Sequence, residues 1–367
     1  METLKADVAN GELKRVYRKQ KGSFLRKGLI FAFASGISYG LFSAFLTVGE
    51  ASGVWNDFWA LPIAGTIIGY LLLCAIGSSL NDLISGIWCL VIAAMKGKMR
   101  DFLPALKSKP GLMIVVGGLC GGPIASTCYI VGLMMAGGIA AAVTALCTAV
   151  GAILSRILFK QKLNARMILG IFICFFAAVV LGGTTLGDVD AKSTIGMCIA
   201  FIAAIAWGVE GCIAGYGTIM VDYEIAITIR QLTSGFANLI VLVPVLCIIA
   251  NATVNMSGVE GSTYLFFVGG ALFSTALIWF VISAFFANPA YSLWYKGNSM
   301  CGTALGMVCN SMYAFWCPFF MMVLCGWIFG WEGYTLTPVQ WLMALVEVFG
   351  IWVIAMNPLD VFRKKEA

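Results

Sequence analysis

Long apolar runs recur along the whole chain and are separated by short polar stretches. An α-helix needs about 20 apolar residues to cross a hydrocarbon core about 30 Å thick, and most of the runs reach that length. The pattern predicts an all-α polytopic membrane protein with about ten transmembrane helices. The predicted spans are residues 28–48, 78–96, 111–135, 138–159, 167–186, 195–217, 227–250, 263–287, 300–328 and 338–357.

The composition agrees with this pattern and excludes a soluble domain. Of 367 residues, 61% are hydrophobic and 11% are charged, and the mean hydropathy is +0.95. We expect the bilayer and a small-molecule substrate as partners, and no nucleic acid. The chain has no histidine, and its 13 cysteines form no CxxC pair, so we expect neither a metal nor another cofactor. Without histidine, a proton-coupled step would need a carboxylate.

The basic residues set the expected orientation. Residues 1–27 carry eight Lys or Arg and are interpreted as a cytoplasmic tail, or else as a basic surface helix on anionic lipid. If the chain alternates sides, the basic stretches 96–109, 156–166 and 363–365 lie on the same side as this tail. We therefore expect a multi-pass protein of the plasma membrane with both termini in the cytoplasm, 358–367 being the C-terminal tail. The acidic residues expected on the outer side are Glu50, Asp57, Asp188, Asp190, Glu260 and Glu332.

The two halves of the chain resemble each other. "FAFASGISYG" (31–40) aligns with "IAFIAAIAWG" (199–208), and "SLNDLISGIWCLVI" (79–92) aligns with "TIRQLTSGFANLIV" (228–241). Five helices per half give the second copy the opposite orientation, so the sequence predicts an inverted repeat of 28–186 and 195–357 joined by an outside linker, 187–194. Such repeats place a substrate site near the midplane.

The first half contains about 19 more residues than the second between these matches. They fall in an apolar segment at about 57–77, which is interpreted as re-entrant, interfacial or an extension of the second predicted span.

These features resemble the drug/metabolite transporter superfamily, EamA-like branch. The resemblance rests on the two inverted halves, the aromatic-glycine pairs Tyr39-Gly40 and Trp207-Gly208, and the ending "IFGWEGYTLTPVQWLMALVEVFGIWVIA". It departs at Gln161, where the family usually has a glutamate. The resemblance implies a central cavity, alternating access, and Tyr39 and Trp207 beside the substrate. A homodimer is a further expectation, with Glu347 at a partner-helix or dimer contact.

Glu210 is the leading candidate site residue because it interrupts the apolar run "AWGVEGCIAGYG" (206–217). An ionised glutamate at the bilayer centre costs about 2.5–3.5 kcal/mol on insertion scales, so it faces protein or water. It is interpreted as binding a cation or carrying a proton, or else as a buried acid that bonds a neighbouring helix. Further candidates for substrate binding are the rings and polar groups of Trp207, Tyr39, Trp279, Tyr313, Asn310 and Ser274. Asp82 and Arg230 are expected at opposite membrane surfaces, where each snorkels or acts in a gate.

A carboxylate with aromatic rings favours a secondary transporter of a small cationic or zwitterionic metabolite, or of a cationic drug. The alternative within transport is a proton-coupled carrier of an amino acid, nucleoside or sugar. An integral-membrane enzyme is a remote alternative, since no paired-aspartate metal motif or nucleophile elbow occurs within the spans. An ion channel is disfavoured by the lack of a filter motif.

Overall fold

The computed structural model describes residues 27–28, 30–31, 33–159, 165–186, 191–301 and 311–355, and no strand occurs among them. The first long helix covers residues 33–50. The elements that follow are α2 (Val54–Ala60), η1 (Pro62–Gly65), α3 (Ile67–Met95), α4 (Met99–Lys107), α5 (Lys109–Leu119), η2 (Cys120–Ser126), α6 (Thr127–Ala136), α7 (Ile139–Ala145), α8 (Cys147–Phe159), α9 (Ala165–Leu186), α10 (Ala191–Met220), α11 (Tyr223–Ala237), η3 (Asn238–Leu242), α12 (Val243–Thr253), η4 (Leu265–Gly269), α13 (Gly270–Leu272), α14 (Leu277–Cys301), α16 (Tyr313–Met321), η5 (Met322–Ile328) and α17 (Pro338–Ala355).

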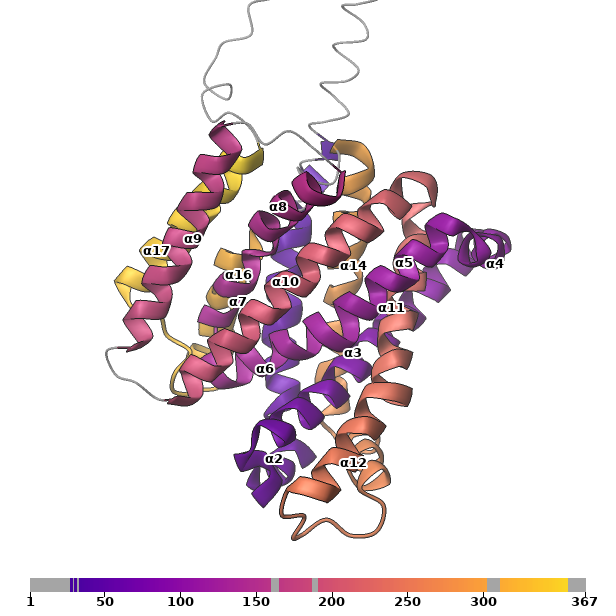
Figure 1. The fold of residues 1–367 in the computed structure, drawn as a ribbon. Helices are drawn as coiled ribbons and strands as arrows, with labels where there is room; N and C mark the ends of the chain where they lie inside the picture. Colours follow the sequence, from indigo (N-terminus) through magenta and orange to yellow (C-terminus); the bar gives the residue numbers. More distant parts are fainter. Residues whose placement is uncertain are drawn as a thin grey trace, which may run out of the picture.

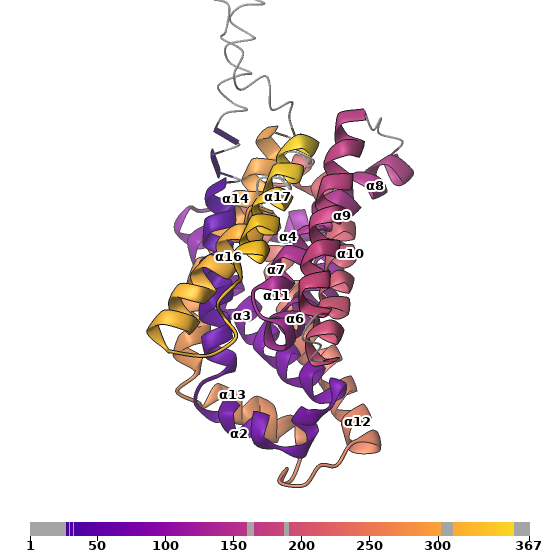
Figure 2. The same cartoon turned by 90° about the vertical axis from the view of Figure 1, so that its left-hand side faces the viewer.

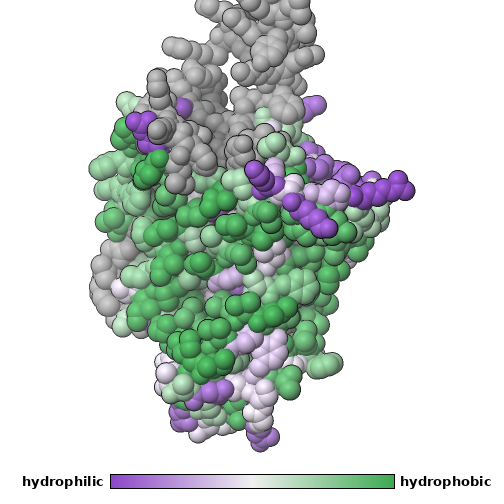
Figure 3. Space-filling view, turned by 45° about the vertical axis from the view of Figure 1, so that its right-hand side comes forward, coloured by the Kyte–Doolittle hydropathy of each residue, from purple (hydrophilic) through white to green (hydrophobic). Residues whose placement is uncertain are grey.

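The long helices run along one axis and form an elongated bundle (Figures 1 and 2). Within the described residues, five helical stretches are long and apolar enough to cross a membrane. They are Ile67–Met95, Lys109–Ala136, Ala191–Ile213, Tyr223–Thr253 and Leu277–Gly297. Apolar side chains cover the flank of the molecule, and polar ones gather toward its ends (Figure 3). These are the features of an all-α membrane protein, as the hydropathy pattern predicts.

One end of the bundle is basic, and we call it the basic end. It holds α4 with the flanking residues Lys96, Lys98 and Lys109 (Figure 1). Lys98 donates to Asp222 at 2.8 Å, which ties the end of α3 to the start of α11. The opposite end carries α2, α13 and the loop after α12 (Figures 1 and 2).

Several of the helices have a polar residue as N-terminal cap. The Thr66 hydroxyl accepts from the Gly69 N–H at the start of α3, and the Ser108 hydroxyl accepts from Gly111 N–H at the start of α5. The Asp222 carboxylate accepts from Glu224 N–H at the start of α11. Each cap satisfies a donor that lacks a partner within its own helix. A polar residue before an apolar run therefore fixes where the run enters the bundle.

The extra apolar segment of the first half divides into two parts. Residues 67–77 extend the second predicted span, so that α3 is one helix of 29 residues. Residues up to Gly65 form α2 and η1, which lie across the opposite end beside α13 (Figure 2). Of the three alternatives for this segment, the structure has the helix extension for residues 67–77.

The prediction of a single eighth span over 263–287 is wrong. The helix breaks after Leu272, and α14 begins at Leu277 and continues to Cys301. The Ser274 hydroxyl accepts from Ala276 N–H and from Val54 N–H, both at 3.1 Å, and so caps the break and holds the start of α2. Hydropathy alone does not reveal this break, because the residues around it are also apolar.

Five helix pairs contribute to the interior. α3 packs along α11, α9 along α17, α10 along α5 and α6, and α7 along α16. The helix of residues 33–50 packs on α14, where the Ser283 hydroxyl donates to the Phe42 carbonyl at 2.9 Å. The centre of the bundle is therefore bounded by 33–50, α3, α10, α11 and α14.

Candidate substrate site in the bundle interior

A cluster of charged side chains lies in the interior between α3, α10 and α11. Arg230 donates to Glu210 twice, from Nε to Oε1 at 2.8 Å and from Nη2 to Oε2 at 3.2 Å. It also reaches the Asp82 Oδ2 from Nη1 at 3.5 Å. Glu210 and Arg230 are fully buried, and Asp82 is 2% exposed. The arrangement joins two carboxyl groups to one guanidinium, and we call these three residues the charge cluster.

Neighbouring polar groups complete the charge cluster. The Gln231 Oε1 accepts from the Arg230 Nη1, the Ser234 hydroxyl donates to Asp82, and the Tyr295 hydroxyl donates to the Glu210 Oε1 at 3.3 Å. Buried charges persist in a protein only when they are paired and hydrogen-bonded, and here each charged group has both kinds of partner.

The predicted positions of Asp82 and Arg230 at opposite membrane surfaces are wrong. Because α3 begins at Ile67, Asp82 lies near the middle of its helix and not close to an end. Arg230 lies in the third turn of α11 and points inward to Glu210. The side chains that were expected to snorkel to water instead contact each other inside the bundle, at 3.5 Å.

Two glycines of the π-helical segment η2 give this cluster its space. A Cβ on Gly121 would lie 1.8 Å from the Glu210 Oε2 and 2.8 Å from the Arg230 Nη2. A Cβ on Gly122 would lie 1.8 Å from the Ser234 Oγ. The segment also contains Pro123, which removes a backbone donor and favours the wider π-helical turn. The "GGP" stretch is therefore a part of the site that residue chemistry alone did not single out.

Five aromatic rings form a second group beside the charge cluster, and we call it the aromatic cluster. The Tyr39 ring stacks on Tyr313 at 4.4 Å between centroids and contacts Tyr129, Trp207 and Tyr291 at 5.7–5.9 Å. All five side chains are 5% exposed or less. Three of the predicted site residues, Tyr39, Trp207 and Tyr313, thus meet in one place.

Tyr291 joins the aromatic cluster to the charge cluster. The Arg230 guanidinium carbon lies 4.4 Å from the centroid of the Tyr291 ring. This distance is within the range of a cation–π interaction. The Trp207 Nε1 is buried without a hydrogen-bond partner among the described residues. A donor left in this way is costly, and an acceptor on a bound molecule would satisfy it.

The remaining predicted site residues lie elsewhere. Trp279 stacks on Phe45 at 6.2 Å and meets Phe329, toward the opposite end from α4. Ser274 caps the break before α14. Asn310 lies outside the described residues.

Two further carboxyl groups are buried without a partner among the described residues. Glu50, expected on the outer side of the membrane, is fully buried, and a Cβ on Gly77 would lie 1.6 Å from its Oε1. It ends the first long helix, next to α2 at the end of the bundle opposite α4. Glu347 is also fully buried and lies on α17, whose main partner is α9.

Four residues of these two clusters and their hydrogen-bond partners are not among the predicted site residues: Tyr129, Tyr291, Tyr295 and Gln231. Each lies in an apolar run in which a ring or an amide is unremarkable, because aromatic residues make up 13% of the chain. Gln231 had one usable signal: the repeat alignment pairs it with Asp82.

Comparison with known proteins gives a fold but no family. No protein-family model matches the chain, and no curated protein matches it. A solved structure described as "Crystal structure of protein" aligns with 90% of this chain and 99% of its own chain, with a TM-score of 0.51 and 17% sequence identity. The two proteins therefore share an overall fold over nearly their whole lengths.

Proposed function

We propose that the protein is a secondary transporter that moves a small cationic or zwitterionic solute, a metabolite or a drug, by alternating access. The observation that carries this proposal is the charge cluster, with its two carboxyl groups and one guanidinium, beside the aromatic cluster. Ionisable residues inside a membrane protein are expensive to bury and commonly mark a substrate or ion pathway.

The composition of the charge cluster favours a positively charged occupant. Arg230 can neutralise one of the two carboxylates, so a second positive charge is needed when both are ionised. A proton or a substrate ammonium supplies it. The contacts of Arg230 are an example of how the site can bind a cation. Its guanidinium is held by the Glu210 carboxylate and by the face of the Tyr291 ring. A substrate cation would use the same two kinds of group.

The contacts between α3 and α11 support an inverted repeat, as in the drug/metabolite transporter superfamily. The alignment of 79–92 with 228–241 pairs Asp82 with Gln231 and Ser85 with Ser234. The hydrogen bonds between the two helices cross these pairs. Gln231 donates to Ser85 at 2.8 Å, and Ser234 donates to Asp82. A two-fold axis between the two helices would produce this exchange. The pairing of α9 with α17 and of α7 with α16 fits the same axis.

We assign the basic end to the cytoplasmic face of the plasma membrane, because basic residues gather on the cytoplasmic side of membrane proteins. Under this proposal both termini are cytoplasmic.

A binding screen followed by flux measurements tests the proposal. Purified protein is heated with organic cations, amino acids, nucleosides and sugars, since a ligand of the folded state raises the unfolding temperature. Each ligand found is then offered to proteoliposomes with and without an imposed pH gradient. We expect saturable, gradient-driven uptake. Solute flux that scales like single-channel conductance would refute a carrier.

Glu210→Gln decides between the two substrate classes, with Glu332→Gln on the exposed loop before α17 as the matched control. Loss of ligand binding at every pH indicates that Glu210 recognises a cation. Retained binding with lost pH dependence indicates the alternative, a proton-coupled carrier of an amino acid, nucleoside or sugar in which Glu210 carries only the proton.

A further inference from the structure

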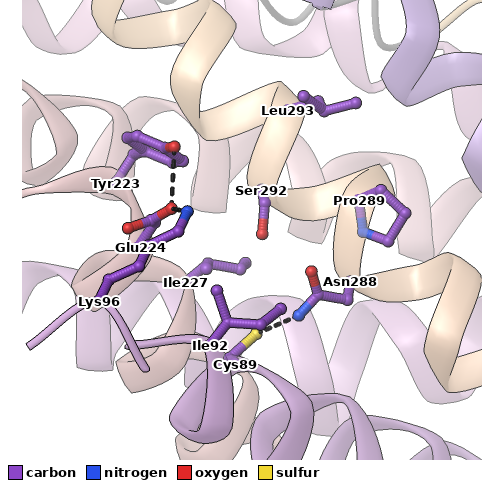
Figure 4. A pocket seen from close by; sticks show the side chains of 10 residues that line it. All are labelled: Cys89, Ile92, Lys96, Tyr223, Glu224, Ile227, Asn288, Pro289, Ser292 and Leu293. Atoms are coloured by element: carbon purple, nitrogen blue, oxygen red, sulfur yellow. Dashed lines mark hydrogen bonds and ion pairs between the residues drawn. The ribbon is translucent and has the colours of Figure 1, made fainter. Parts of the chain in front are cut away.

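A pocket of about 210 Å³ opens at the basic end between α3, α11 and α14. Its mouth carries Lys96 and Glu224, which form an ion pair, and the Tyr223 hydroxyl donates to the same carboxylate at 3.0 Å (Figure 4). The Lys96 side chain is 52% exposed, so the mouth faces water.

The interior of the pocket is suited to a small solute with an apolar part and a polar part. Ile92, Ile227 and Leu293 supply apolar surface, and the Ser292 hydroxyl points inward from α14 (Figure 4). At the floor the Asn288 Nδ2 donates to the Cys89 Sγ at 3.0 Å. The volume is below the 300–1,000 Å³ typical of sites for drug-sized ligands.

One layer of side chains separates this floor from the charge cluster. On α3, Ser85 lies one turn beyond Cys89, and Asp82 follows three residues further. The Gln231 Nε2 donates to the Ser85 Oγ across that layer at 2.8 Å, and both residues are fully buried. Gln231 in turn accepts from Arg230. Cys89 and Asp82 are seven residues apart on α3, about two helical turns or roughly 10 Å, and the Gln231–Ser85 bond lies between them and is bonded to the charge cluster.

Toward the opposite end the closure is thicker and contains more packed side chains. Every residue of α3 from Leu72 to Asp82 is buried, a helix length of roughly 15 Å. Trp55, Phe58 and Phe267 add a fully packed group of rings beyond it, each 2% exposed or less. The structure is therefore closed firmly at one end and by a single hydrogen-bonded layer at the other.

We infer that the pocket is the vestibule through which a small cationic solute reaches the charge cluster from the basic end, and that the Gln231–Ser85 hydrogen bond is its gate. The inference deepens the proposed function and rests on it. The gate responds to occupancy of the site because Gln231 bonds to Ser85 and to the Arg230 guanidinium, whose contact with Asp82 a bound cation would weaken.

Thiol labelling tests the vestibule without a known substrate. The protein in nanodiscs is treated with a cationic methanethiosulfonate (ethyltrimethylammonium) or an anionic one (ethylsulfonate), and each cysteine peptide is quantified by mass spectrometry. Native Cys89 reports on the pocket floor. Ser234→Cys reports on the far side of the gate, because Ser234 lies beside Asp82. We expect modification of Cys89 and much slower modification at position 234, with the cationic reagent favoured at both relative to a free small thiol.

Gln231→Ala removes the gate bond and should accelerate labelling at position 234 by about 2- to 12-fold, the factor that corresponds to one neutral hydrogen bond. Thr228→Val is the matched control, since Thr228 is buried on the same helix and donates only to the Glu224 carbonyl. Thermal unfolding of each variant verifies that it is folded.

The vestibule proposal is refuted if Cys89 is not modified in the folded protein although it is modified in the unfolded protein. It is also refuted if the anionic reagent reacts faster than the cationic one, each relative to a free small thiol. The gate is overturned if Gln231→Ala leaves position 234 unchanged or if Thr228→Val accelerates it equally. Labelling requires no transport, so uptake without Cys89 labelling refutes the vestibule alone. Labelling without uptake of any solute refutes the proposed function alone.

Discussion

Arg230 should contribute more to the stability of the bundle than either of its carboxylate partners. Arg230→Met leaves Glu210 and Asp82 buried without a cation, and removing one partner of a buried ion pair costs about 3–5 kcal/mol. Glu210→Gln leaves one oxygen that can accept from Arg230 and replaces the other by an amide NH2, which cannot accept, so one of the two charge-assisted bonds is lost. At about 1.5–3 kcal/mol for a hydrogen bond to a charged group, the loss is about 1.5–3 kcal/mol. Asp82→Asn changes one contact at 3.5 Å and should cost less than about 1 kcal/mol.

Double-mutant cycles convert these differences into coupling energies. The double variant Arg230→Met with Glu210→Gln should be more stable than the sum of the single losses by about 2–3 kcal/mol, because the unpaired carboxylate is removed with its partner. The cycle with Asp82→Asn should give less than about 1 kcal/mol, in keeping with its longer contact.

Unfolding in mixed micelles, followed by tryptophan fluorescence against denaturant, measures all five variants. The prediction is wrong if the coupling energy between Arg230 and Glu210 is below about 0.6 kcal/mol, the average for interhelical hydrogen bonds in a membrane protein. It is also refuted if the Asp82 coupling equals or exceeds the Glu210 coupling.

Three further predictions concern single sites. Gly121→Ala should lower the unfolding temperature because its Cβ would lie 1.8 Å from a carboxylate oxygen, whereas Gly269→Ala meets nothing within 4 Å and should be neutral in the same thermal assay. Glu347→Leu should raise the unfolding temperature, since it removes a buried carboxyl that has no partner among the described residues; a large loss of stability would contradict this. Partial burial opposes the charge of Lys98, but hydrogen bonds to acidic residues raise its pKa overall. The stability difference from Lys98→Met should therefore be constant from neutral pH to about pH 10.4 and shrink as the pH rises through the raised pKa, measured by unfolding at a series of pH values.

Hydropathy predicts the helices where each run is bounded by a polar cap. The starts of α5 and α11 follow Ser108 and Asp222, and the predicted spans there differ from the helices by a few residues. Hydropathy fails where an apolar run contains a change in geometry. The break at 273–276 is capped by Ser274, and the 29-residue α3 begins at the Thr66 cap, within a run that is apolar on both sides of it.

The candidate site was predictable as far as single residues carry a signal. Glu210 stands out because a charge in an apolar run is rare, and Tyr39 and Trp207 because they recur in both halves. The contacts between these residues could not be predicted. The predicted position of Asp82 was wrong because α3 begins eleven residues before the predicted span, which puts Asp82 near the middle of the helix.

The two halves of the repeat contribute unequally to the charge cluster. Glu210 and Arg230 both belong to the second half and are joined by two bonds, at 2.8 and 3.2 Å, whereas Asp82 belongs to the first half, contacts Arg230 once at 3.5 Å and accepts a hydrogen bond from Ser234. If the halves rock against each other, the weaker contact breaks and the stronger pair moves as a unit. The equivalent positions Asp82 and Gln231 also differ in charge, so the layer nearer the basic end is closed by an amide and the layer beyond Arg230 by a carboxylate. Under the proposed function, a cation that enters from the basic end passes a neutral gate, meets the carboxylate that Arg230 holds least firmly, and weakens the Arg230–Asp82 contact, which is one of several bonds between the two halves.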